Sequence, residues 1–362
     1  MMDGTDRTDK TGARLMLDLS GEHGTIPRAE VLAVLEAEGI RYTVEGSDDR
    51  VLLVTVHGDG PKAVADRLAG RLSMCHSISI HLATTEPTAE GIMAGAEQAA
   101  AALPEFPGTA SFRIRCTRMT GHGQGLDVPW LEKETARFLW KGRRVDLKHP
   151  DKEYKILVSS KVYIGETLVE PDRLALETKR AQFRPFFSPI TLHPRLARTL
   201  VNLARLPPGG TFLDPFCGTG GILLEAGTMG TGAKLIGTDI DPKMVEGCMT
   251  NLEHYGVTGC TIIQSDIRNV SRILGEVKVD AIATDPPYGR SSNSFGDDTW
   301  DLYAALLESA AQLLAPGRFI AVSLPCKELT GLPMRGLIPV EMHAAKVHRS
   351  LTRYFHILRN EG

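Results

Sequence analysis

Short apolar segments that end on an aspartate recur in the second half of the chain and constrain its fold more than any other feature. TFLD, KLIGTD, TIIQSD and VDAIATD follow one another within residues 211–285, and a helix-like segment follows each of them. This alternation is typical of a parallel sheet with helices on both faces. Because parallel strands end at the same edge of a sheet, the terminal aspartates are predicted to meet at one site. They are Asp214, Asp239, Asp266 and Asp285.

The rest of the chain divides into segments of different texture. RFIAVSL continues the sheet, and HAAKVHRSLTRYFHILRN indicates two strands that close it in antiparallel fashion. Strands and helices between residues 14 and 109 have the order of a ferredoxin-like sandwich. We therefore expect an α/β protein with a disordered tail at 1–13, a ferredoxin-like region at 14–109, a basic α+β core at 110–165, a linker at 166–190 and a Rossmann-like, mostly parallel seven-stranded sheet at 191–362.

Composition excludes several classes of protein. A hydrophobic fraction of 42% and a charged fraction of 23% are those of a globular chain rather than a disordered one. No apolar stretch is long enough to span a membrane, and the N-terminus lacks the apolar core of a signal peptide. Six cysteines without any C-x-x-C indicate neither a metal site nor a disulfide scaffold. We expect a cytoplasmic protein without a metal.

Charge is unevenly distributed along the chain. Residues 110–184 carry 16 Lys and Arg against 10 Asp and Glu, whereas the whole chain has a net charge of −3. A basic segment within an acidic chain is typical of a polyanion-binding surface, although a solvated basic face has the same composition.

A glycine-rich turn follows the first aspartate-terminated strand, in LDPFCGTGGILLEAG at 213–227. Gly218, Gly220 and Gly221 let the backbone approach a ligand, and the N–H groups that begin the next helix favour a negative group. A tight strand–helix turn uses the same glycines without a ligand. A nicotinamide fingerprint is disfavoured, because the third glycine of G-x-G-x-x-G falls at Leu223. The turn therefore favours a nucleotide-bearing ligand of another kind.

The next two strands end on candidate nucleoside-binding residues. Asp239 lies 19 residues after Gly220, where a carboxylate can accept hydrogen bonds from both ribose hydroxyls. Asp241, directly before Pro242, is the better helix cap, which leaves Asp239 for a ligand. Asp266 is a candidate acceptor for an adenine amino group, although each aspartate taken alone is also a common cap. The apolar faces predicted for the ring are Ile240 and Ile267.

The motif DPPY at 285–288 ends the fourth strand. An isolated D-P-P is typical of a surface turn, but here it stands at the carboxyl end of a strand and behind LDPFCGTGG. With these motifs in this order, the chain resembles the class I methyltransferases that use S-adenosylmethionine (SAM) and act on exocyclic amino groups. SAM is then the cofactor that the resemblance implies.

That chemistry accounts for the residue types in the motif. An exocyclic base nitrogen is a poor nucleophile because its lone pair is conjugated with the ring. The Asp285 carboxylate and the Pro286 carbonyl would accept hydrogen bonds from its N–H groups and so turn the lone pair toward the methyl group. Pro287 helps to fix the position of that carbonyl. Tyr288 would stack on a base taken out of its own stack. Asp285 is also a candidate proton acceptor.

Five segments of the chain make the resemblance specific to one family of these methyltransferases. RPFFSPITLHPRLARTLVNLARL, DPFCGTGGILLEAG, GTDIDPKMVEGCMTNLEHYG, TDPPYGRSS and HRSLTRYFHIL occur in the order seen in the archaeal tRNA (guanine-10-N2) methyltransferases. SFRIRCTRM, VDLKHPD and KVYIGE resemble the THUMP module that this family carries ahead of its catalytic domain. The resemblance implies transfer of one or two methyl groups to guanosine 10 of tRNA. A monomer is the default expectation, because the sequence identifies no symmetry-forming surface, and the need for a small activating partner protein stays open.

The resemblance also implies two sets of binding residues. The first set binds the cofactor. From the glycine turn and the strand ends it takes Asp214, Phe216, Gly218, Thr219, Gly220, Gly221, Asp239, Ile240, Asp266 and Ile267. His193 and Arg195 are added because they match a family segment near the methionine end of SAM. A THUMP module holds the 3′ acceptor end of tRNA, so basic residues become candidate phosphate contacts. They are Arg113, Arg115, Arg118, Lys141, Arg143, Arg144, Lys148, Lys155 and, just past the catalytic motif, Arg290.

Three alternatives stay open on the sequence. A related THUMP-bearing enzyme acts on another tRNA guanosine, and that family more often has Asn in place of Asp285. DNA adenine or cytosine amino-methyltransferases share the (D/N)PPY motif but do not explain the basic segment. A tRNA-binding folding factor with a relict site would not need the intact set of aspartates and Tyr288.

Overall fold

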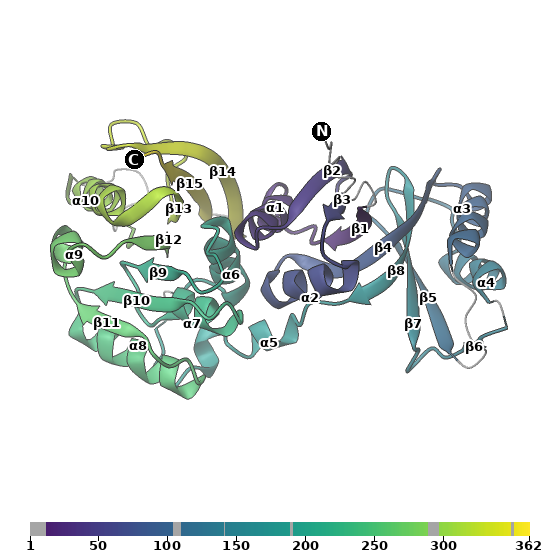
Figure 1. The fold of residues 1–362 in the computed structure, drawn as a ribbon, viewed down its shortest axis with the longest axis horizontal. Coiled ribbons are helices and arrows are strands. Elements are labelled where there is room, and N and C mark those ends of the chain that lie inside the picture. Colours follow the sequence, from purple (N-terminus) through teal and green to yellow (C-terminus); the bar gives the residue numbers. More distant parts are fainter. Residues whose placement is uncertain (1–11, 104–109, 141, 189–190, 289–296, 349–350) are drawn as a thin grey trace, which may run out of the picture. The chain divides into compact units, whose positions relative to one another are not determined.

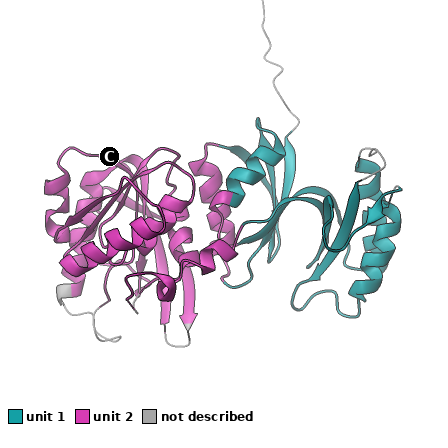
Figure 2. Ribbon diagram, turned by 90° about the horizontal axis from the view of Figure 1, so that it is seen from below, with its two compact units in different colours: residues 1–22, 40–69, 75–171 teal, residues 23–39, 70–74, 172–362 magenta. Residues whose placement is uncertain are grey.

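The computed structural model describes residues 12–103, 110–140, 142–188, 191–288, 297–348 and 351–362. The chain divides into two compact units, coloured separately in Figure 2. Unit 1 comprises Met1–Glu22, Ile40–Ala69 and Cys75–Pro171, and unit 2 comprises His23–Gly39, Gly70–Met74 and Asp172–Gly362. Unit 2 is thus assembled from three separate stretches of the sequence.

Unit 1 is built on one eight-stranded sheet in the order β2-β3-β1-β4-β8-β7-β5-β6 (Figure 1). Its strands are β1 (Ala13–Leu19), β2 (Arg41–Ser47), β3 (Val51–His57), β4 (Cys75–Thr85), β5 (Ser111–Arg118), β6 (Arg144–Val145), β7 (Lys152–Val158) and β8 (Val162–Val169). The helices along this part of the chain are α1 (Ile26–Ala37), α2 (Pro61–Arg71), α3 (Ala89–Ala102) and α4 (Val128–Leu139). The order β2-β3-β1-β4 is that of a ferredoxin-like sheet.

Pairing between β4 and β8 joins the ferredoxin-like strands to the basic segment. The predicted boundary at residue 110 therefore divides the chain within one continuous sheet. In β5, Phe112 and Ile114 are buried while Arg115 is exposed, as the alternation in SFRIRC predicts. The range 166–190, predicted as a linker, contains the end of β8, the short helix α5 (Leu174–Glu177) and the 3-10 helix η1 (Ala181–Phe183).

Unit 2 is built on a seven-stranded sheet in the order β11-β10-β9-β12-β13-β15-β14. Its strands are β9 (Thr211–Asp214), β10 (Lys234–Asp239), β11 (Thr261–Gln264), β12 (Val279–Thr284), β13 (Leu314–Leu324), β14 (Leu337–His348) and β15 (Leu351–Asn360). Strands β9 to β13 are parallel, and β15 runs antiparallel to both β13 and β14. The predicted parallel sheet with an antiparallel end is confirmed.

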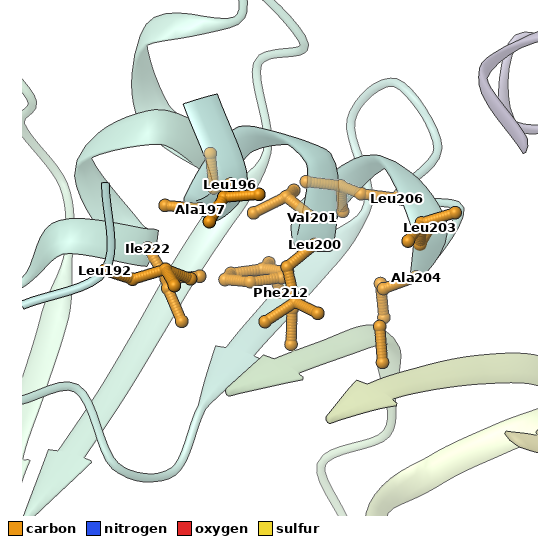
Figure 3. Packing of buried hydrophobic residues seen from close by; sticks show 14 of the residues in the cluster. Leu192, Leu196, Ala197, Leu200, Val201, Leu203, Ala204, Leu206, Phe212 and Ile222 are labelled. Atoms are coloured by element: carbon orange, nitrogen blue, oxygen red, sulfur yellow. The ribbon is translucent and has the colours of Figure 1, made fainter. Parts of the chain in front are cut away.

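Helices cover both faces of this sheet, because successive residues of its strands point to opposite sides. The helices are α6 (Pro194–Leu203), α7 (Gly221–Thr228), α8 (Pro242–His254), α9 (Ile267–Leu274) and α10 (Asp297–Leu313). Phe212 packs with α6 and α7 on one face, and Figure 3 shows it among Leu196, Leu200 and Ile222. Leu213, the next residue, packs with α9 and α10 on the other face.

Helix α1 belongs to unit 2 although it lies near the start of the chain. Ile26, Ala29 and Ala33 pack into the same core as α6. Behind this apolar face, the fully buried carboxylate of Glu30 accepts hydrogen bonds from the Ser73 hydroxyl (2.7 Å), the Met74 N–H (2.9 Å) and further donors. Those donors are the Ser73 N–H (3.1 Å), the Asn202 amide (2.9 Å) and the Thr199 hydroxyl (3.3 Å). Glu30 therefore ties the three stretches of unit 2 together.

Candidate active site

The carboxyl ends of β9, β10, β11 and β12 surround a pocket of about 360 Å³, hereafter the first pocket. Of the predicted cofactor residues, Phe216, Gly218, Asp239, Ile240, Asp266 and Ile267 line it. Asp285 and Pro287 of the DPPY motif line it as well. Predicted nucleoside-binding and catalytic residues thus share one cavity at the sheet edge where ligands of such folds bind.

The glycine turn leaves open space beside the first pocket. Gly218 has φ +50° and Gly220 has φ +81°, which L side chains rarely adopt. A Cβ atom at Gly218 would meet nothing within 4 Å, whereas one at Gly220 would lie 2.8 Å from the Cys248 sulfur. The first glycine therefore leaves room for a ligand, and the second is required by packing. Thr219 is buried and Gly221 begins α7, and neither lines the pocket.

Asp239 holds the turn in place. Its Oδ2 accepts the Gly218 N–H (2.9 Å) and its Oδ1 accepts the Asp241 N–H (2.9 Å). Asp241 caps α8 by accepting the Lys243 N–H (2.9 Å), as predicted. Each Asp239 oxygen keeps a further lone pair, so the carboxylate can still accept hydrogen bonds from a ligand in the pocket.

Asp266 combines the two roles considered for it. Its Oδ1 accepts the Arg268 N–H (2.9 Å) and caps α9, and its Oδ2 lies 3.0 Å from the Arg268 guanidinium. The residue nevertheless lines the first pocket beside Ile240, whose side chain is 63% exposed. An apolar side chain this exposed next to carboxylates suits a flat ring with polar edges.

Asp214 lies beneath the pocket and is 1% exposed. Its Oδ1 accepts the Thr284 hydroxyl (2.7 Å) and the Phe216 N–H (3.2 Å), while its Oδ2 has no partner among the described residues. Burial raises the pKa of Asp214 to about 7, and the nearby carboxylates of Asp239 and Asp285 add to the rise. The folded chain therefore holds a proton here that the unfolded chain releases near pH 4.

This raised pKa predicts that Asp214→Asn changes how stability depends on pH. Between about pH 4 and 7 the folded wild type binds one proton more than the unfolded chain, so its free energy of unfolding falls as the pH rises. The asparagine variant lacks this proton and should be more stable than wild type at pH 8 by a few kcal/mol, with little difference at pH 4. Urea denaturation at the two pH values measures the difference. The control is Asp301→Asn, which changes an exposed aspartate. If the free energy of unfolding of Asp214→Asn falls with rising pH as much as that of wild type, the raised pKa of Asp214 is contradicted.

The Asp285 carboxylate is held from two sides. Its Oδ1 accepts the Tyr288 hydroxyl at 2.5 Å, and its Oδ2 forms an ion pair with Arg353 of β15. The Tyr288 hydroxyl also lies 3.0 Å from the Ser323 hydroxyl of β13, and the Arg353 guanidinium lies 5.3 Å from the centre of the Tyr288 ring. Burial raises the pKa of Tyr288 above its ordinary value, so the phenol stays protonated and donates to Asp285.

Arg353 and Ser323 do not follow from the motifs in the sequence. The segment HRSLTRYFHIL indicates a strand, but nothing in it distinguishes a buried arginine from a solvent-facing one. Arg353 is 7% exposed and reaches a residue 68 positions away in the chain. The position of Tyr288 also differs from the expectation, because the side chain predicted to stack on the base is hydrogen-bonded to the Asp285 carboxylate and faces the Arg353 guanidinium.

His193 and Arg195 lie away from the first pocket. His193 caps α6 and lines a second pocket of about 320 Å³, together with Thr191, Val347 and Arg353. Arg195 donates to the Ser73 carbonyl (3.4 Å) and contacts the Met74 sulfur. The two predicted cofactor residues therefore separate, with His193 in the second pocket and Arg195 in another cavity of about 270 Å³ beside Leu174 and Glu177.

The predicted phosphate contacts of unit 1 fall into three groups. Arg143 is 1% exposed and donates to the Tyr154 hydroxyl (2.9 Å) over the Phe112 ring, so the prediction that it contacts phosphate is wrong. Arg113 pairs with Glu153, and Lys155 pairs with Glu170 (2.6 Å). The exposed members are Arg115, Arg118, Arg144 and Lys148. Lys141 and Arg290 lie outside the described residues.

Among the described residues, no group of three or more His, Cys, Asp and Glu side chains is arranged to hold a metal ion. Within the same ranges, no helix is both long and apolar enough to cross a bilayer.

Comparison with known proteins places the chain in a family. The family model described as UPF0020, RMKL-like, methyltransferase domain, matches residues 181–354. The tRNA (guanine(10)-N2)-dimethyltransferase of Methanothermobacter thermautotrophicus is 35% identical, and the match covers 95% of this chain and 98% of the relative. The enzyme of that name from Methanocaldococcus jannaschii is 30% identical, with 94% and 98% covered.

A solved structure agrees in fold. The crystal structure of TrmN from Thermus thermophilus superposes with a TM-score of 0.55 at 24% identity, covering 96% of this chain and 99% of TrmN. With the sheet order, the DPPY motif at the pocket and the two archaeal relatives taken together, the chain is a methyltransferase and belongs to the family of the archaeal tRNA (guanine(10)-N2)-dimethyltransferases.

Proposed function

We propose that this protein transfers one or two methyl groups from SAM to the exocyclic N2 amine of guanosine 10 in tRNA. The observation that carries the proposal is the position of Asp285, which directly follows β12 and lines the first pocket with its carboxylate held in place. The names of the archaeal relatives support the base, the atom and the position.

The first pocket fits the adenosine part of SAM. A nucleoside needs a carboxylate for its ribose hydroxyls, an acceptor for its amino group and apolar walls for its ring. Asp239, Asp266 and Ile240 provide these beside the space left by Gly218. When bound, SAM supplies a methyl group on a positively charged sulfur.

Residues of the chain prepare the amine for this transfer. The Asp285 carboxylate and the Pro286 carbonyl accept hydrogen bonds from the two N–H groups of the amine. This favours a pyramidal nitrogen whose lone pair is no longer conjugated with the ring. A rigid carboxylate fixes the distance and direction of the amine, and orientation of this kind supplies a large part of the rate of many enzymes. The N–H proton that the product loses passes to Asp285 or to water.

Exposed cations and aromatic side chains of unit 1 suit contact with tRNA. Arg115, Arg144 and Lys148 are exposed, and Trp130 and Trp140 near the two ends of α4 are 45% and 56% exposed. Cations bind phosphates, and exposed aromatic rings stack on unpaired bases. We propose that these cations contact tRNA phosphates and that the two rings stack on unpaired bases of the tRNA.

A triple variant tests the three cations. Combining Arg115→Ala, Arg144→Ala and Lys148→Ala should raise the Kd for tRNA about 10-fold or more and lower the slope of log K against log salt concentration by about 2–3, since each phosphate contact contributes about 0.9. The matched control removes three exposed cations elsewhere in the unit, with Arg14→Ala, Arg41→Ala and Lys62→Ala. Equal losses in the two triple variants would show that Arg115, Arg144 and Lys148 make no specific contact with tRNA.

The function itself is tested by product analysis. Purified protein is incubated with methyl-labelled SAM and an unmodified tRNA transcript, and the nucleosides are separated by mass spectrometry. N2-methylguanosine or N2,N2-dimethylguanosine that disappears when guanosine 10 is replaced by adenosine supports the proposal. Label at another guanosine favours the related THUMP-bearing enzymes, and label in DNA adenine or cytosine favours the DNA enzymes. SAM binding and tRNA binding without transfer by the protein alone would contradict an enzyme that acts without a partner.

A further inference from the structure

Three elements of unit 2 converge on one carboxylate. Asp285 follows β12, the Ser323 hydroxyl that meets Tyr288 comes from β13, and Arg353 comes from β15. The antiparallel pairing of β13 with β15, with Leu324 opposite Tyr354, brings Arg353 to this end of the sheet. Both oxygens of the carboxylate therefore have a partner before any substrate is present.

The ion pair is poorly explained as a stabilising contact. The side chains of Arg353 and Asp285 are 9% and 17% exposed, and taking two charges out of water costs about as much as their attraction returns. The Nε–H of Arg353 is buried and has no partner among the described residues, which adds a further cost. The buried Arg353 guanidinium, with one unsatisfied N–H beside the proposed reacting group, is therefore better explained by a role in function than by stability.

The contacts of Arg353 supply that reason. Its guanidinium holds Asp285 Oδ2 while Tyr288 holds Oδ1, so the carboxylate cannot rotate about its Cβ–Cγ bond without breaking a hydrogen bond to one of them. We propose that Arg353 is a positioning residue for methyl transfer, which fixes the plane of the Asp285 carboxylate so that its remaining lone pairs face the N–H bonds of the target amine. The inference rests on the proposed function, because it concerns the amine that Asp285 holds.

Kinetics of two Arg353 variants test the proposal. Arg353→Ala should lower kcat for N2 methylation about 10²-fold, as expected for a misplaced catalytic group, and change the KM for tRNA less than about threefold. Arg353→Lys keeps a charge but not the planar fork and should lose about 10-fold. The matched control is Arg359→Ala, which removes an exposed arginine of the same strand that pairs with Glu361, and it should keep kcat within about twofold.

Chemical rescue separates positioning from mere stability. Arg353 lines the second pocket, so a small cation can reach the space that Arg353→Ala vacates. Millimolar guanidinium should restore kcat of Arg353→Ala at least about fivefold, whereas sodium ions at equal ionic strength and Asp285→Ala with guanidinium should show no gain. The double variant Asp285→Ala, Arg353→Ala should lose no more than Asp285→Ala alone, since a positioning residue acts through its partner.

Two outcomes would overturn the inference. One is a kcat of Arg353→Ala within threefold of wild type, and the other is a loss that guanidinium leaves unchanged and that adds to the loss of Asp285→Ala. If Arg353→Ala does not fold, Arg353→Lys and its double variant decide by the same criterion of additivity. If wild type methylates a base other than guanosine 10, the proposed function fails and the Arg353 comparison is made on the observed product, so the two failures remain distinguishable.

Discussion

Asp285→Ala is expected to lower kcat for N2 methylation about 10³-fold while SAM still binds. In the proposed mechanism the Asp285 carboxylate orients the amine nitrogen and accepts a hydrogen bond from its N–H group, and losses of about 10²–10⁴-fold are usual for groups of this kind. Asp239 and Ile240, which we propose bind the adenosine part of SAM in the first pocket, are left in place. Initial rates with labelled SAM give kcat, and calorimetric titration gives the Kd for SAM.

Asparagine at the same position sharpens this result. Asp285→Asn keeps the shape and one oxygen acceptor but removes the charge that faces Arg353, so it should fall between alanine and wild type, at a loss of about 10²-fold. Asp301→Ala, which removes an exposed carboxylate of α10, should behave as wild type. A kcat within tenfold of wild type in the alanine variant would show that the amine is oriented by other groups.

Glu30→Ala is expected to lower the free energy of unfolding by about 3–5 kcal/mol, because it leaves several buried donors without an acceptor. The Ser73 N–H and the Met74 N–H lose the carboxylate that accepts from them, and the Asn202 amide keeps its hydrogen bond to the Arg71 carbonyl but loses the one to Glu30, at a buried site. Urea denaturation followed by circular dichroism measures the loss. The effect should exceed that of the other single substitutions proposed for stability.

The controls for Glu30 distinguish a buried network from a helix effect. Glu97→Ala removes an exposed glutamate of α3 and should change stability by less than about 0.5 kcal/mol. Glu30→Gln keeps one acceptor and should lose less than alanine. Equal, small losses for Glu30→Ala and Glu97→Ala would mean that the stretches of unit 2 are held by apolar packing alone.

Helix α1 shows where prediction of the fold from sequence ends. The segment PRAEVLAVLEAEGI predicts it, because Val31, Leu32, Leu35 and Ile40 recur at helical spacing and Pro27 stands in the first turn. The structure confirms a helix at Ile26–Ala37. Which surface covers its apolar face does not follow, because periodicity identifies a buried face and not the partner. The partner is α6, and the buried Glu30 that accompanies it is indistinguishable in sequence from a solvated glutamate.

The candidate site is also predictable only in part from the sequence. The aspartates at the ends of the parallel strands are predicted to lie at one edge, because the topology of the sheet brings these strand ends together. Arg353 and the buried Arg143 did not follow, because a charged side chain in a strand or basic segment is expected to be solvated. Each is buried by contacts with residues distant in sequence or with aromatic rings, which composition and spacing do not report.

The division of unit 2 into three stretches has a consequence for synthesis on the ribosome. Helix α1 is complete by Ala37, whereas α6, against which it packs, ends at Leu203. At roughly 5–20 residues per second, the apolar face of α1 waits on the order of ten seconds or more without its partner. Unit 1 can fold during that interval, but the catalytic unit cannot close until the nascent chain has passed α6. The newly made protein should therefore depend on chaperones that shield the apolar face of α1. Slowly translated codons in the segment that encodes residues 75–171 should lengthen this interval and increase aggregation of the protein.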